Sequence, residues 1–150
     1  MTDLIGCDKV GNMKITELAQ LPKNKWGKFL KNGVKLEPHE EKTAKYLVKY
    51  GFIVDVIRPM NTPKVHNPDF LIGGAIWEVK APIKYNKNTI KNRIKEAAKQ
   101  ADRIIFDLRN IKTNYMEAEK EIIKLFMGNQ NLRRMILITK SGKTIDFFKR

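Results

Sequence analysis

The fold of this chain is decided by the stretch NPDFLIGGAIWEVKAP, residues 67–82. Two runs of apolar and β-branched residues flank a Gly-Gly pair, a pattern typical of a β-hairpin with a two-residue turn. Centring the turn on the two glycines sets Asp69 opposite Glu78, because the strands then pair antiparallel. The stretch therefore predicts strands at residues 69–72 and 75–81.

Outward from this hairpin, the periodicity of apolar residues alternates between helix and strand. Helices are predicted where apolar residues recur every three to four positions, namely at residues 38–50, 88–102 and 114–127. Further strands are predicted at residues 52–59, 103–108, 134–139 and 144–148, with a loop at 61–68. The order αβββαβαβ predicts an α/β fold with a central mixed sheet flanked by helices. Residues 1–35 show weak periodicity and are expected to form an irregular arm with one short helix, followed by one domain at 36–150.

Composition limits the possible partners of the chain. Its 150 residues include 30 Lys and Arg against 16 Asp and Glu, a formal net charge of +14. Such a charge attracts polyanions, so nucleic acid is the leading partner, with an anionic membrane surface or an acidic protein as alternatives. The single cysteine, Cys7, excludes an intramolecular disulfide and a cysteine-based zinc site. No apolar run approaches the roughly 20 residues of a membrane span, and no signal peptide is visible. We therefore expect the protein to act in the cytoplasm.

The chemistry is concentrated in Asp69, Glu78 and Lys80. Glu78 and Lys80 are two residues apart on one strand, so both side chains leave the same face. Asp69 is placed opposite Glu78, and cross-strand partners have Cβ atoms about 5 Å apart. Two carboxylates at this spacing suit a hard divalent cation such as Mg²⁺, while a lysine beside them can position water or neutralise charge. The alternative is a surface hairpin that carries an ordinary Glu–Lys pair.

These residues resemble the signature of the PD-(D/E)xK nuclease superfamily, here Pro68-Asp69 followed by Glu78-Val79-Lys80. The resemblance implies a restriction-endonuclease-like αβββαβ core and hydrolysis of phosphodiester bonds with a divalent metal, Mg²⁺ being favoured. It also implies that a glutamate on the first helix completes the metal site, and Glu41 fits the usual pattern, with Glu40 as the alternative. A polar residue on the second helix often reaches the active site of such enzymes, and Gln100 is the candidate.

A narrower resemblance covers about residues 36–140 and includes NTIKN at 88–92 and QAD at 100–102. These stretches resemble the C-terminal tRNase domain of contact-dependent inhibition toxins of the CdiA type. The resemblance implies a ribonuclease that cleaves tRNA in a target cell and is neutralised by a cognate immunity protein. An acidic surface on that partner would match the charge of +14. Because such toxins end very long proteins and this chain begins with Met1, we expect an excised domain or a free-standing relative.

Basic and polar residues after the hairpin are candidates for nucleic-acid binding. Those nearest the predicted metal site could clamp phosphates, although a solvated helix face is the simpler interpretation of any single lysine. The candidates are Lys84, Lys87, Lys91, Asn92, Arg93 and Lys95.

Two alternative functions are also compatible with these residues. A DNA endonuclease would use the same catalytic residues, although the chain has no obvious separate module for reading DNA. A basic nucleic-acid-binding module without catalysis would be indifferent to metal and to substitution of Asp69 or Lys80. The presence of Asp69, Glu78 and Lys80 together favours catalysis.

Overall fold

A computed structural model describes residues 7–10, 13–57 and 69–149 of the chain. The chain forms two compact units: a smaller unit of residues 19–79, and a larger unit of residues 1–18 and 80–150. Each unit combines helices with a mixed sheet, so the predicted α/β class with helices flanking mixed strands is confirmed.

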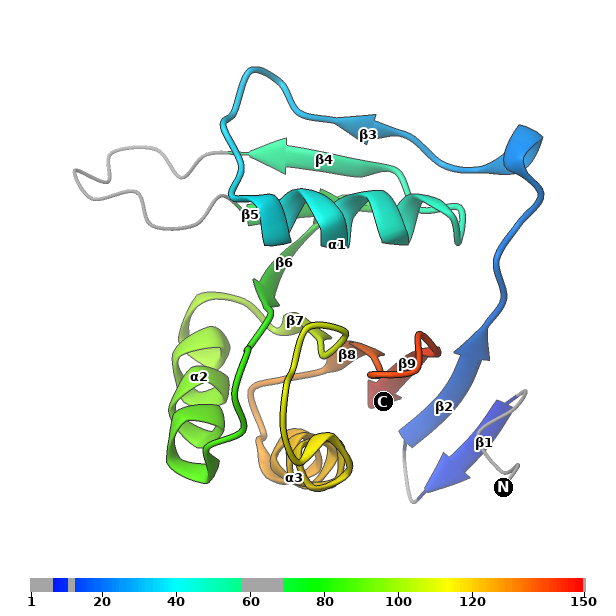
Figure 1. Ribbon diagram of the computed structural model, residues 1–150. Helices are drawn as coiled ribbons and strands as arrows, with labels where there is room; N and C mark the ends of the chain where they lie inside the picture. Colours follow the sequence, from blue (N-terminus) through cyan, green and yellow to red (C-terminus); the bar gives the residue numbers. More distant parts are fainter. Residues whose placement is uncertain (1–6, 11–12, 58–68, 150) are drawn as a thin grey trace. The chain divides into compact units, whose positions relative to one another are not determined.

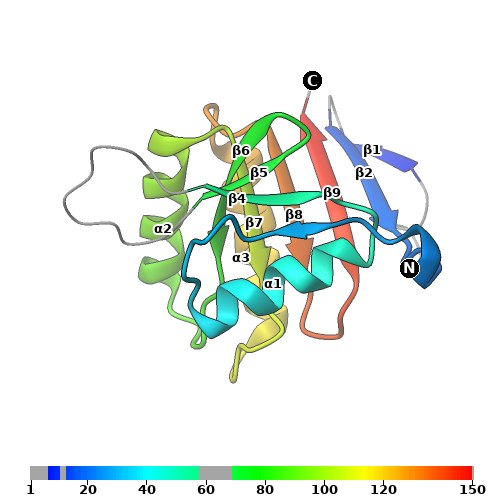
Figure 2. The same cartoon turned by 90° about the horizontal axis from the view of Figure 1, so that it is seen from above.

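The smaller unit contains a sheet with the strand order β3-β4-β5-β6. Strand β3 pairs parallel with β4, whereas β4 with β5 and β5 with β6 pair antiparallel. Helix α1 runs alongside β3 and β4 and packs against both (Figures 1 and 2). The elements are β3 (Phe29–Leu30), α1 (Pro38–Val48), β4 (Val54–Ile57), β5 (Asp69–Ile72) and β6 (Ala75–Lys80), with a 3-10 turn, η1, at Lys23–Lys25.

The start of α1 follows from its local sequence. Pro38 occupies the first turn, where a missing backbone N–H costs nothing. Glu37 and Glu40 form a reciprocal capping box, and the Glu37 backbone N–H donates to Oε1 of Glu40 at 2.8 Å. Ala44 and Leu47 are fully buried on the inner side of the helix. The predicted helix is confirmed, although it ends two residues earlier, at Val48.

The larger unit contains a sheet with the strand order β1-β2-β9-β8-β7. Only β7 and β8 pair in parallel; the remaining neighbours are antiparallel. Both helices of the unit contribute buried residues to one core with β2, β7, β8 and β9, so they cover one face of the sheet (Figure 1). The elements are β1 (Cys7–Val10), β2 (Met13–Leu18), α2 (Lys87–Gln100), β7 (Arg103–Asp107), α3 (Tyr115–Gly128), β8 (Arg134–Ile138) and β9 (Thr144–Lys149).

The hairpin register is as predicted. Ile72 pairs with Ala75, and Phe70 pairs with Trp77. The two turn glycines have φ angles of 60° and 81°, the left-handed region that a turn of this kind requires. The predicted strands and helices from residue 69 onward are confirmed, with bounds shifted by one to two residues.

The N-terminal segment differs from the prediction. Residues 1–35 were expected to form an irregular arm with one short helix. The described part contains the short 3-10 turn η1 but also the strands β1, β2 and β3. The side chains of Met13 and Ile15 are buried in the core of the larger unit. They alternate with Lys14 and Thr16, which are not buried. This alternation is only a few residues long, and pairing of β2 with β9, far away in sequence, stabilises it. The predicted loop at 61–68 and the end of the strand at 52–59 lie outside the described residues.

Candidate nuclease site

Strand β6 buries two ionisable side chains on one face. Glu78 is 5% exposed and Lys80 is 8% exposed. Trp77 alternates with them and is buried on the opposite face of the strand. Removing a carboxylate and an ammonium from water is costly unless both are paired or hydrogen-bonded, so a buried acid–base pair is a common feature of functional sites.

The hairpin register brings Asp69 to Glu78. Phe70 pairs with Trp77, so the next pair along the ladder sets the backbone of Asp69 against Glu78. Asp69 begins β5 and also pairs with Ile57 of β4, while its side chain lies outside the described part. Among the side chains that the structure describes, no group of three His, Cys, Asp or Glu could hold a metal ion.

The two glutamates of α1 lie in different environments. Glu40 is 4% exposed, and burial raises the pKa of its carboxyl above 4.5 despite the backbone hydrogen bond from Glu37. Glu41 lies at the surface, where Lys31 and Lys45 each approach its carboxylate at 3.0 Å and lower its pKa. Glu41, expected from the sequence as the metal ligand, is thus held in surface ion pairs, whereas the alternative Glu40 points inward.

The candidate polar residues in and just before α2 differ in exposure: all are exposed except Arg93. Gln100, expected to support the site, is the exposed last residue of the helix. Arg93 is half-buried, and its buried Nε atom has no hydrogen-bond partner among the described residues. The other candidates for nucleic-acid binding in this region are exposed: Lys84, Lys87, Lys91, Asn92 and Lys95.

Comparison with known proteins identifies the family. Residues 66–144, just over half of the chain, match the model of the family described as "Contact-dependent growth inhibition CdiA C-terminal domain". The chain belongs to this family. The matched residues contain Asp69, Glu78, Lys80 and all of α2, whereas α1 precedes them.

A solved structure has a similar fold to this CdiA C-terminal domain. It is the "CdiA-CT/CdiI toxin and immunity complex from Burkholderia pseudomallei", with a TM-score of 0.60 and 22% sequence identity. The similarity covers 83% of this chain and 100% of the other. No curated protein sequence matches the chain. At this identity the solved structure supports the fold of the domain.

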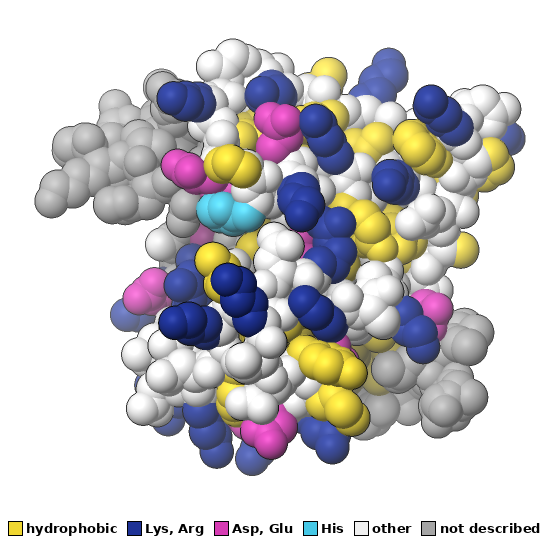
Figure 3. Space-filling model, viewed as in Figure 1, with side chains coloured by type: hydrophobic (Ala, Val, Ile, Leu, Met, Phe, Trp, Pro, Cys, Tyr) yellow, Lys and Arg dark blue, Asp and Glu magenta, His cyan; other side chains and the backbone are white. Residues whose placement is uncertain are grey.

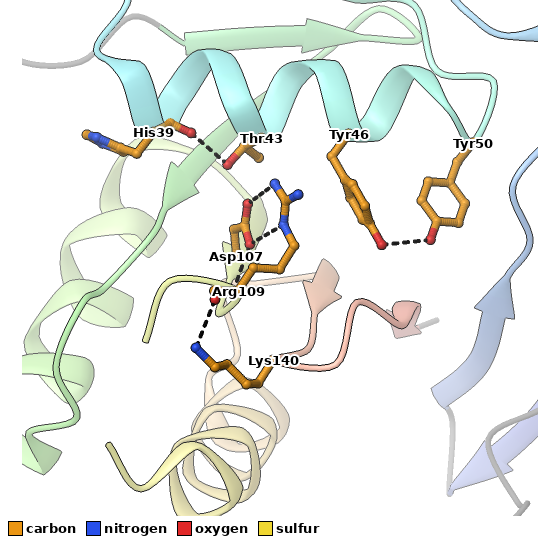
Figure 4. Close-up of polar contacts among 7 residues, drawn as sticks. All are labelled: His39, Thr43, Tyr46, Tyr50, Asp107, Arg109 and Lys140. Carbon is orange, nitrogen blue, oxygen red and sulfur yellow. Dashed lines mark hydrogen bonds and ion pairs between the residues drawn. The ribbon is translucent and has the colours of Figure 1, made fainter. Parts of the chain in front are cut away.

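The larger unit of the CdiA C-terminal domain contains a charged network that the sequence did not indicate (Figure 4). Asp107, at the end of β7, accepts hydrogen bonds from Nε and Nη2 of Arg109 at 3.0 and 2.8 Å, and from its backbone N–H at 3.1 Å. Nζ of Lys140 donates to the carbonyl oxygens of Arg109 and Ile111 at 3.1 and 2.7 Å. The only sequence feature that could have indicated this ion pair is the Asp-x-Arg spacing of Asp107 and Arg109. The network stabilises the turn after β7, so we assign it a structural role.

Two further contacts of Figure 4 lie along α1 of the same domain. The hydroxyl of Thr43 donates to the carbonyl oxygen of His39 at 3.0 Å, one helical turn back. Tyr50 and Tyr46 bring their hydroxyl oxygens within 3.3 Å, and their rings pack at 5.5 Å between centroids. These contacts order the helix and its end.

Basic side chains outnumber acidic ones on the face of the CdiA C-terminal domain drawn in Figure 3. This excess is in keeping with the net charge of +14. Within the described residues, no helix combines the length and apolar character that crossing a bilayer requires.

Proposed function

We propose that this CdiA C-terminal domain is a metal-dependent nuclease of the PD-(D/E)xK type that cleaves tRNA and acts as an interbacterial toxin. The observation that carries the proposal is the burial of Glu78 and Lys80 on one face of β6, with Asp69 opposite Glu78 in the hairpin ladder. A surface hairpin with an ordinary Glu–Lys pair would leave both side chains solvated, and neither is.

The residues suit a divalent metal by the chemistry of their donor atoms. Asp69 and Glu78 supply carboxylate oxygens, the ligands that Mg²⁺ prefers. Glu40 is favoured over Glu41 as a third carboxylate, because Glu40 is buried and Glu41 is occupied by Lys31 and Lys45. When bound, the metal would activate water and stabilise negative charge on the phosphate.

Lys80 has the second role in this proposal. Its ammonium lies two residues from Glu78 on the same face of β6, so it can orient a water molecule or offset charge that develops on the phosphate. A lysine beside two carboxylates also reduces their mutual repulsion when no metal is bound. Gln100 lies exposed at the end of α2 and has a supporting role in this hypothesis.

The net charge of the domain and its family support a proposal for its substrate and its protein partner. The charge of +14 favours a polyanionic substrate, and tRNA is preferred because of the resemblance to CdiA-type tRNase domains. The structurally similar domain was solved as a toxin and immunity complex. By analogy, we propose that an immunity protein with an acidic surface binds this domain and blocks cleavage.

The test is incubation of the purified domain with total tRNA and, separately, with plasmid DNA, in Mg²⁺ or in EDTA. Three variants accompany it: Asp69→Ala, Glu78→Gln and Lys80→Gln. The matched control is Glu117→Gln, which removes an exposed acid from α3. We expect Mg²⁺-dependent cleavage of tRNA that all three variants lose and the control retains.

Other outcomes discriminate among the functions. Cleavage of DNA alone would keep the catalytic residues and replace the substrate. Binding of tRNA without cleavage of either substrate would contradict catalysis and favour a nucleic-acid-binding module. Cleavage that persists in EDTA would contradict the role of the metal.

A further inference from the structure

We propose that four lysines of α2 form a phosphate-binding track that holds the backbone of a structured RNA independently of its base sequence. This lysine track consists of Lys87, Lys91, Lys95 and Lys99. The inference deepens the proposed function, from which it takes the identity of the polyanion, and it assigns a substrate-binding role to α2.

The spacing of the track gives it a regular geometry. Its members are four residues apart, so neighbouring side chains lie on the same side of the helix, each about 6 Å further along the axis. All four are exposed. The buried residues Ile90, Ile94 and Ala97 fix the other side of α2 against the core of the larger unit. The helix therefore presents a row of ammonium groups about 18 Å long from a rigid support.

The mutual repulsion of the track is unfavourable for the helix itself. Like charges four residues apart repel each other, and Lys87 at the start of the helix opposes its dipole, whereas Lys99 in the last turn is favourably placed. The first turn of α2 carries no acidic residue, and the side chain of Asn86 provides the cap by accepting from the backbone N–H groups of Asn88 and Thr89. Within the described part of the chain, no ion pair joins an acidic residue to any of the four lysines. A bound polyanion would neutralise this row.

The surroundings of the track favour nucleic acid over a protein partner. Protein interfaces have an apolar core and are depleted in lysine. The large hydrophobic side chains that are exposed in the described residues all lie outside α2. Lysine ammonium groups act as point charges on phosphates, and such contacts supply affinity without reading bases.

Arg93 does not belong to the track. It is two residues from Lys91 and from Lys95, and residues two apart on a helix do not face each other. Its buried Nε also distinguishes it from the exposed lysines. Arg93 was predicted from the sequence to bind phosphates together with these lysines; the structure distinguishes it from them by its partial burial.

The test compares two triple variants of equal net charge. The track variant carries Lys91→Gln, Lys95→Gln and Lys99→Gln. The control variant carries Lys23→Gln, Lys25→Gln and Lys35→Gln, which remove three exposed lysines from the smaller unit. Affinity for total tRNA is measured in EDTA over a range of salt concentrations, so the result does not depend on cleavage.

We expect the track variant to bind tRNA on the order of tenfold more weakly than the control near physiological salt. The slope of log affinity against log salt should fall by about 0.7–0.9 for each lost phosphate contact. A third variant with Arg at the three track positions should restore binding, because it restores the charge. Thermal unfolding of each variant reports folding.

Two results would overturn the inference. One is an equal loss of tRNA affinity in the track and control variants, which would assign binding to net charge alone. The other is an unchanged affinity of the track variant for tRNA. If this variant also binds polyglutamate more weakly than the control does, the track is assigned to an acidic protein. Either result can occur whether or not Mg²⁺-dependent cleavage is found, so this inference and the proposed nuclease activity fail separately.

Discussion

Glu40 and Glu41 are adjacent on α1 but present their carboxylates to opposite environments. Glu40 is buried and caps the helix through the backbone N–H of Glu37, whereas Glu41 bridges Lys31 and Lys45 at the surface. Burial raises the pKa of Glu40, and the two lysines lower the pKa of Glu41. Two neighbouring residues of one type are therefore distinguishable by experiment.

The first prediction concerns cleavage. Glu40→Gln should lower the initial rate of Mg²⁺-dependent tRNA cleavage by roughly 10–100-fold, the usual cost of removing a group that supports a metal site. Glutamine keeps the capping oxygen, because Gln also serves at this position of a capping box, so the helix should still form. Glu41→Gln removes only exposed ion pairs and should change the rate less than about twofold. If Glu40→Gln cleaves tRNA as fast as Glu41→Gln, Glu40 does not contribute to the catalytic site.

The second prediction concerns stability and pH. Because burial raises the pKa of Glu40 in the folded state above 4.5, the folded protein holds this proton more tightly than the unfolded chain. The resulting stabilisation is complete below the unfolded pKa and is lost as pH rises through the folded pKa. Glu40→Gln cannot titrate, so its free energy of unfolding should improve relative to the wild type as pH rises from about 4.5.

Glu41→Gln is the control for the second prediction, because the sign is reversed. The folded pKa of Glu41 is lowered, so its ion pairs stabilise the protein above the unfolded pKa and are lost as pH falls. Urea unfolding across this pH range measures both differences. A Glu40→Gln difference that does not change with pH would contradict the raised pKa.

Local sequence signals were sufficient for the hairpin and for most of the helices. Gly73-Gly74 allows positive φ angles, and apolar alternation on both sides leaves a single register that buries Phe70 and Trp77. The same two signals predict that Asp69 lies opposite Glu78. The helix start at Pro38 was equally local.

Tertiary contacts decided what the sequence could not. Strand β2 is short and lysine-containing, and its pairing with β9 joins residues about as far apart as the chain allows. The choice between Glu40 and Glu41 depends on which side of α1 faces inward, and both flank Ala44 and Leu47 in sequence. Burial resolves that ambiguity, because Glu40 is only 4% exposed whereas Glu41 pairs with Lys31 and Lys45 at the surface.

The third prediction concerns the pair Asp107 and Arg109. Arg109→Met leaves the buried carboxylate of Asp107 without its two guanidinium hydrogen bonds, so we expect a loss of about 3 kcal/mol in the free energy of unfolding. The double variant with Asp107→Asn should recover part of this loss, because the buried negative charge is gone. Urea unfolding of the single and double variants measures the coupling. Additive losses would show that the pair does not act as a unit.

The fourth prediction concerns the turn that sets the register. Apart from the adjacent residues of the turn, no described residue has an atom within 4 Å of the position that a Cβ would take at Gly73 or Gly74, so the cost of substitution there comes from the positive φ angles. Gly73→Val should cost about 1–2 kcal/mol in the free energy of unfolding, whereas Gly73→Asn should cost much less, because asparagine tolerates this conformation. If the ladder places Asp69 against Glu78 for catalysis, Gly73→Val should also lower tRNA cleavage under conditions where the protein remains folded, and Gly73→Asn should retain it. Full activity in a folded Gly73→Val variant would mean that cleavage does not depend on the geometry of this hairpin.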